Sequence, residues 1–333
     1  AWAMRAKELL TADAPAPIRA MVTCLQLNIA HVRYEMPRVV ELAHQALDLL
    51  AEGDPYGLSV TALANLASAQ MSMGDLPAAT KTFREMARLG QETGHRFLLE
   101  TAWSSLAYLL HLQLKPREAE ALCRQAIEQA VGPRGELFPV AGRSLVLLGL
   151  IAYERNELAA AGEHLAKGLE LAQQAGPSSS VMQAAFTLAW LQALSGDREA
   201  ALATATGVCQ AASQLNLPLL DAFVAGCEAD LRLRLGDVEA AARWAEAAGL
   251  SPGDPVQYER EAEYVSFARL LLAQDRPAEA QQLLESLEQF ARTRGIGRSL
   301  LTVHILRAQA EHTLGHHTEA LTHLEQAVQL AAP

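Results

Sequence analysis

The chain has 333 residues and a formal net charge of −11, and half of its residues are hydrophobic although only 5% are aromatic. This acidic balance argues against a surface that wraps a phosphate backbone, because such a surface needs clustered Lys and Arg. Ala and Leu, two strong helix formers, carry most of the apolar load, so the composition favours helices over strands.

A short turn recurs along the chain at a period of about 40 residues. Its best copies are GDLPAA (74–79), GDREAA (196–201), GDVEAA (236–241) and GHHTEA (315–320). Four weaker copies of the turn continue the same period. In chain order the turns begin at Tyr34, Gly74, Leu114, Asn156, Gly196, Gly236, Asp275 and Gly315.

Each turn is predicted to join two antiparallel helices. A glycine can end the first helix in the left-handed conformation without a Cβ penalty, and the Asp that follows it can cap the second helix. The segment 1–12 is predicted to be the second helix of a preceding pair. Segments 51–57, 131–137, 175–180 and 250–256, rich in Gly, Pro and polar residues, are predicted loops between pairs.

Small side chains are expected where the two helices of a pair approach each other. Seven residues before the turn lie Ala67, Ala107, Gly149, Ala189, Ala229, Ala268 and Ala308. Five residues after it lie Ala79, Ala119, Ala161, Ala201, Ala241, Ala280 and Ala320. Larger residues nine after the turn, namely Phe83, Cys123, Leu165, Leu284 and Leu324, are expected to fill the gap to the next pair, whereas Ala212 is expected to be exposed.

This pattern resembles the tetratricopeptide repeat (TPR), most clearly in residues 64–87. The period is longer than the usual 34 residues. Together with phrases such as RLGQETGH (88–95), it resembles the sensor region of MalT-like, LuxR-family transcription activators. In that family a nucleotide-binding module precedes the helical superhelix and a helix-turn-helix module follows it. Neither module is present in this sequence, so we interpret the chain as a fragment of a longer regulator.

Catalytic and metal-binding patterns are weak. The segment 249–253 matches G-x-S-x-G around Ser251, but a nucleophile elbow requires a strand before the serine and a helix after it. His312, His316, His317 and His323 cluster near the last turn without a cysteine beside them, which favours exposed turn histidines over a metal site. We therefore predict no enzymatic activity, no metal and no cofactor.

Cys24, Cys123, Cys209 and Cys227 are widely spaced, without a C-x-x-C pair, and this fits the reducing cytoplasm better than a disulfide framework or a zinc site. The longest strongly apolar run, 144–153, is half of what a membrane span requires, and the N-terminus lacks a signal-peptide pattern. A soluble cytoplasmic protein is expected.

The TPR resemblance implies that the first helix of each pair lines the concave face. Carried over to this sequence, the family's register predicts these ligand-binding residues: Tyr108, His111, Arg143, Tyr153, Gln183, Phe186, Trp190 and Arg234. Aromatic faces could stack on a ligand while Arg, Gln and His fix its polar groups. Alternatively, each aromatic packs as core. A sugar, a peptide and an aromatic metabolite all remain open as ligands.

The prediction is an all-α, right-handed superhelix of about eight antiparallel helix pairs, forming one TPR-like domain over residues 1–333. Its proposed role is the ligand-sensing and protein-interaction region of a cytoplasmic transcriptional regulator. The expected partners are a small-molecule inducer or peptide, other domains of the same regulator, and an inhibitory or activating protein, without direct nucleic-acid or membrane binding. The alternative is a TPR-like scaffold or peptide receptor not linked to transcription.

Overall fold

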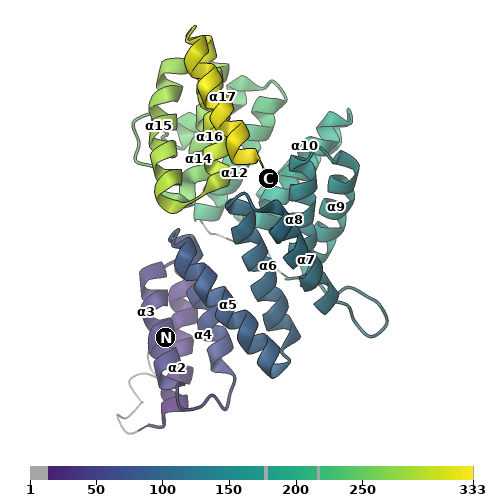
Figure 1. The fold of residues 1–333 in the computed structure, drawn as a ribbon, viewed down its shortest axis with the longest axis vertical. Helices are drawn as coiled ribbons and strands as arrows, with labels where there is room; N and C mark the ends of the chain where they lie inside the picture. The colour runs from purple at the N-terminus through teal and green to yellow at the C-terminus, as the bar shows by residue number, and fades with distance from the viewer. Residues whose placement is uncertain (1–13, 176–178, 216–217, 333) are drawn as a thin grey trace. The chain divides into compact units, whose positions relative to one another are not determined.

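The chain folds into consecutive pairs of antiparallel helices (Figure 1). The computed structural model describes residues 14–175, 179–215 and 218–332, and the predicted helix at 1–12 lies outside them. These ranges contain sixteen α-helices, one 3₁₀ turn at Tyr258–Arg260 and a single isolated bridge between Val131 and Leu137. The all-α prediction is confirmed.

The helices fall into eight pairs within the described residues. The bounds are α2 (Ala16–Val32), α3 (Met36–Leu49), α4 (Leu58–Ser72), α5 (Leu76–Thr93), α6 (Arg96–Leu112), α7 (Pro116–Gln129), α8 (Ala141–Glu154), α9 (Leu158–Ala175), α10 (Ser179–Leu194), α11 (Arg198–Ser213), α12 (Pro218–Arg234), α13 (Val238–Ala247), α14 (Glu261–Ala273), α15 (Pro277–Arg294), α16 (Gly297–Thr313) and α17 (His317–Ala331). None of the helices in the described ranges is long and apolar enough to span a bilayer.

All eight predicted turn residues adopt the left-handed conformation, with φ between 58° and 92°. Four of them are not glycines, namely Tyr34, Leu114, Asn156 and Asp275. At every one of these turns, the next residue donates its backbone N–H to a carbonyl five residues earlier, as in the 2.8 Å bond from Asp75 to Gln70. This bond is the mark of the Schellman motif and fixes the tight reversal between the helices of a pair.

The predicted caps are present where the turn carries Asp. The side chains of Asp75, Asp197 and Asp237 each accept a hydrogen bond from the backbone N–H three residues later, at 2.9–3.1 Å. Such a bond satisfies one of the donors left unpaired at the start of a helix.

The turn glycines should respond to substitution with the opposite sign to a helical glycine. A Cβ on Gly236 meets no atom within 4 Å, but its φ is +85°, so Gly236→Ala should destabilise by about 1 kcal/mol through the backbone alone. Gly207 lies within α11 and is equally open, so Gly207→Ala should stabilise by about 0.5–1 kcal/mol. Urea unfolding gives the change in the free energy of unfolding for each variant. Changes of the same sign would contradict the assigned turn conformation.

The small residues predicted at the helix approach are buried without exception; Ala320, at 6%, is the most exposed. Leu165 fills the predicted gap to the next pair, since it packs in one cluster with Ala184 of α10. Two expectations are wrong. Leu324 is 45% exposed because it lies on the outer side of α17, and Ala212 is buried at 1% because it packs into the cluster between α10 and α12.

The chain divides into two compact units, Ala1–Leu106 and Ala107–Pro333, with the boundary inside α6. In the first unit, Leu27, Val39, Leu42 and Leu66 form the largest part of a core between α2, α3 and α4. The prediction of a single repeat domain over residues 1–333 stays a prediction.

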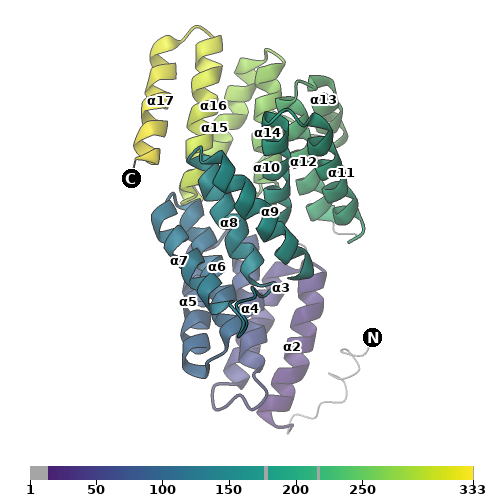
Figure 2. The same cartoon turned by 90° about the vertical axis from the view of Figure 1, so that its right-hand side faces the viewer.

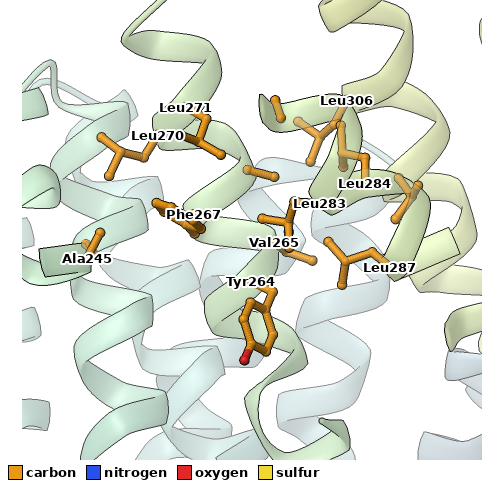
Figure 3. Packing of buried hydrophobic residues seen from close by; sticks show 14 of the residues in the cluster. Ala245, Tyr264, Val265, Phe267, Leu270, Leu271, Leu283, Leu284, Leu287 and Leu306 are labelled. Atoms are coloured by element: carbon orange, nitrogen blue, oxygen red, sulfur yellow. The ribbon is translucent and has the colours of Figure 1, made fainter. Parts of the chain in front are cut away.

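The second unit carries a continuous run of helix pairs, with α8 against α9 and α16 against α17 (Figure 2). Its largest core lies around α14, where Phe267 and Leu271 are buried among side chains from α13, α15 and α16 (Figure 3). This packing fixes α14 so firmly that the side chains on its other face are held in place as well.

Candidate ligand-binding pocket

A cavity of about 250 Å³ lies within the second unit. Its lining comes from the first helix of six successive pairs, α6, α8, α10, α12, α14 and α16. The lining residues are Tyr108, Leu112, Tyr153, Gln183, Phe186, Thr187, Trp190, Phe223, Cys227, Asp230, Leu231, Arg234, Glu261, Ala262, Val265, Ser266, Arg269, Arg298, Ser299 and Thr302.

The cavity is partly open to solvent, and the run of first helices returns on itself around it. The start of α16 lies against the turn after α6, since a Cβ on Gly297 would come within 3.2 Å of the Leu114 side chain. Nearby, the Arg298 Nε donates to the Glu154 Oε1 at 2.7 Å, which ties α16 to the end of α8. Contacts between residues almost 150 positions apart or more thus bring α16 back to α6 and α8.

Six of the eight residues predicted from the sequence line this cavity. They are Tyr108, Tyr153, Gln183, Phe186, Trp190 and Arg234. His111 is buried next to the cavity, where its Nε2 lies 3.7 Å from the Glu154 carboxylate. Arg143 is exposed in the first turn of α8, whereas α8 reaches the cavity through its last turn at Tyr153. Their roles in ligand binding stay predictions.

The aromatic side chains are shared between cavity and core, as the alternative interpretation expected. Phe186 is only 6% exposed and belongs to the core cluster between α10 and α12, with Trp190 and Phe223 packed against it. Each therefore presents one part to the cavity while the rest is fixed by packing, and this gives a rigid apolar wall.

Sequence reasoning missed the contribution of α14 and α16. The same register continued into the seventh pair leads to Ala262, Val265 and Arg269, and in the eighth pair to Thr302, all of which line the cavity. The signal was therefore present in the sequence. Arg298 lies outside that register, at the beginning of α16, and only the return of the helices explains its place.

One polar network joins α12 to α14 across the cavity wall. Asp230 accepts hydrogen bonds from the Arg234 Nε at 2.7 Å and from the Arg269 Nη1 at 2.8 Å. Burial opposes ionisation of Asp230, but the charges of Arg269 and Arg234 outweigh it and hold its pKa below the ordinary value. The Arg234 guanidinium also lies 5.3 Å from the centre of the Trp190 ring, within cation–π range.

A second network lies at the other end of α14. The Ser299 hydroxyl donates to the Glu261 Oε1 at 2.7 Å. Burial raises the pKa of Glu261, while the Ser299 hydrogen bond and the Arg298 charge oppose the shift. Burial also lowers the pKa of His111 to about 4, which keeps the imidazole neutral at pH 7.

The histidine cluster and the G-x-S-x-G segment can both be located in the described part of the chain. No group of three or more His, Cys, Asp or Glu side chains there is placed to hold a metal ion. His316 is exposed and contacts Glu311 at 2.7 Å, and the ring of His312 lies 5.2 Å from that of His317. Ser251 follows α13 in an exposed loop, where its N–H donates to Asp254.

The fold defines a TPR-like helical-repeat domain with a cavity on the face formed by the first helices. Residues 20–333 match the MalT-like TPR region. The chain belongs to this family, and the resemblance drawn from the sequence is confirmed. No curated protein matches the chain.

Solved structures with the same fold are distant in sequence. A Rap protein complexed with Competence and Sporulation Factor has a TM-score of 0.65 and 10% identity, over 98% of this chain and 89% of that one. The apo form of the quorum sensor NprR from B. thuringiensis has a TM-score of 0.55 and 13% identity, over 99% and 91%. The apo form of RapI has a TM-score of 0.50 and 12% identity, over 94% and 97%.

Proposed function

We propose that the chain is the ligand-sensing region of a cytoplasmic transcriptional regulator and that a small molecule binds in its cavity. The observation that carries this proposal is the cavity itself, which is lined by aromatic side chains from α8, α10 and α12 together with charged and hydroxyl groups from α12, α14 and α16. A rigid apolar wall with a few convergent polar groups is the usual composition of a small-molecule site.

Several further observations support the proposal. The link to transcription rests on membership of the MalT-like family. Two proteins of similar fold are described as a complex with a signalling factor and as a quorum sensor. Cys24, Cys209 and Cys227 are free thiols, as expected in a reducing cytoplasm. In this proposal the chain binds without catalysing a reaction.

The alternative is a scaffold or peptide receptor that binds a protein segment along the same face. The volume of about 250 Å³ is slightly below the ~300–1,000 Å³ usual for small-molecule pockets, and it is too small to take up an extended protein segment of many residues. The small molecule is therefore the better supported ligand, and a protein partner would have to contact other surfaces of the repeat.

Native mass spectrometry of the chain after incubation with a cell extract tests the proposal. A sensor should retain one low-mass compound, whereas a scaffold should retain a polypeptide. Retention of polypeptides alone would contradict the small-molecule proposal.

Trp190→Ala should weaken binding of the retained compound by about 5- to 150-fold, corresponding to the ~1–3 kcal/mol of one well-packed aromatic anchor. Phe138→Ala removes an aromatic side chain that is 42% exposed outside the cavity and should leave binding unchanged. Calorimetric titration measures binding, and thermal melting is followed in parallel. A Trp190→Ala variant that loses thermal stability first, and binding only as a consequence, would assign Trp190 to the core.

A further inference from the structure

The charged side chains of the cavity are not distributed like those of the whole chain. The chain carries a net charge of −11, yet three arginines, Arg234, Arg269 and Arg298, line this one cavity. The acidic groups in the lining are Asp230 and Glu261. A site lined with arginines inside an acidic protein attracts anions locally, because nearby charges outweigh distant, screened ones.

The arginine excess is greatest at the end of the cavity next to Trp190. There Asp230 is the shared partner of two guanidinium groups, from Arg234 and Arg269, so these three side chains together carry one net positive charge. Arg298 is different, since Glu154 pairs with it from the end of α8. The uncompensated charge therefore belongs to the Arg234–Asp230–Arg269 cluster, which we call the arginine clamp.

The clamp retains donors that could bind a ligand. A guanidinium has five N–H donors, and the hydrogen bond of Arg269 to Asp230 uses Nη1. The side chains of Arg234 and Arg269 are 34% and 28% exposed, so both are accessible from the cavity. The planar fork of an arginine matches a carboxylate well.

The rest of the cavity has a different chemistry. Along α14, Glu261, Val265 and Arg269 lie on one face at intervals of four residues, so the cavity extends about 12 Å along that helix. The middle of the cavity is apolar and is lined by Val265, Phe186 and Phe223. At the far end, Glu261 and Ser299 form a hydrogen-bonding pair.

We propose that the cavity binds a small monocarboxylic acid, with its carboxylate on the arginine clamp and its apolar body against Val265, Phe186 and Phe223. One uncompensated positive charge matches one carboxylate rather than the two charges of a phosphate monoester. The Glu261–Ser299 pair receives a hydroxyl or amine at the far end of the ligand. This inference rests on the proposed function, because it assigns the chemistry of the same cavity.

Matched acids and amides test the charge requirement directly. The probes are indole-3-acetate, phenylacetate, benzoate and hexanoate, each beside its primary amide, which has the same shape without the charge. Ligand-observed NMR and thermal shift give the affinities for the full chain. At least one acid should bind. The affinity for its amide should be lower by a factor of about ten or more, as expected for loss of a charge-assisted hydrogen bond of ~1.5 kcal/mol.

Two variants of the clamp should shift affinity in opposite directions. Arg269→Gln should reduce acid binding to the level of the amide and leave the amide unaffected. Asp230→Asn keeps the shape of the side chain but removes the competing negative charge, so it should tighten acid binding about three- to tenfold. Arg124→Gln, which changes a 65% exposed arginine on α7, is the matched control and should bind as the parent does.

The outcomes separate this inference from the proposed function. Amides that bind as tightly as the acids would overturn the carboxylate proposal and leave a small-molecule pocket in place. If Asp230→Asn weakens acid binding, the carboxylate proposal is contradicted. The arginine clamp would then serve to hold α12 and α14 together. Failure of every acid to bind would also overturn the proposal, whereas the proposed function is judged by the compound retained in native mass spectrometry.

Discussion

Gly168→Ala should destabilise the second unit by about 3 kcal/mol, at the upper end of the ~1–3 kcal/mol expected for overpacking. A Cβ on Gly168 in α9 would lie 2.7 Å from the backbone nitrogen of Val146 and 3.0 Å from the carbonyl oxygen of Gly142, both in α8. Since both contacts are with backbone atoms, a rotamer change cannot relieve them, and the helices must move apart.

The same helix offers a matched control for this substitution. Gly162 lies six residues earlier in α9, and a Cβ there meets no atom within 4 Å. Gly162→Ala should therefore stabilise by about 0.5–1 kcal/mol through the lower backbone entropy of the unfolded chain. Urea unfolding followed by circular dichroism gives both values. Equal effects of the two substitutions would show that α8 and α9 do not cross at Gly168.

Acidification from pH 7 to pH 4 should cost the second unit about 3 kcal/mol through His111 alone, at ~1.4 kcal/mol for each unit of difference between two pKa values. The buried imidazole has a pKa of about 4 in the folded chain, against 6.5 for an ordinary histidine. Between these values the unfolded chain binds a proton that the folded chain does not. Stability is therefore complete above pH 6.5 and declines as the pH falls towards 4.

His111→Gln isolates this contribution because glutamine is polar and does not titrate. The measurement is the free energy of unfolding of both proteins at several pH values between 4 and 7, and the difference between the two curves removes the titration of the carboxylates. Parallel curves would mean that His111 has the same pKa in the folded and the unfolded chain, with the Glu154 carboxylate 3.7 Å away offsetting the effect of burial.

Much of the candidate site could be read from the sequence once the repeat period was known. The register carried over from the TPR resemblance indicates which positions of each first helix share a face, and Tyr153, Gln183 and Trp190, chosen in this way, line one cavity. The register does not tell how far along each helix the cavity extends. For this reason Arg143, at the beginning of α8, was included although the cavity meets only the end of that helix.

The sequence by itself determined the local structure of this chain. Left-handed residues at the eight turns, Asp caps and buried alanines at the helix approach all depend on groups within a few positions of one another, so a 40-residue pattern suffices to predict them.

Only the tertiary structure decided what the distant residues do together. The pairing of Arg298 with Glu154 and the sharing of Asp230 by Arg234 and Arg269 follow from small rotations between successive pairs. Those rotations depend on side-chain packing between neighbouring pairs, such as that of Leu165 in α9 and Val146 in α8 with Ala184 in α10. A rotation that accumulates over several repeats is not encoded at any single position, and therefore the chemistry of the cavity became visible only in the folded chain.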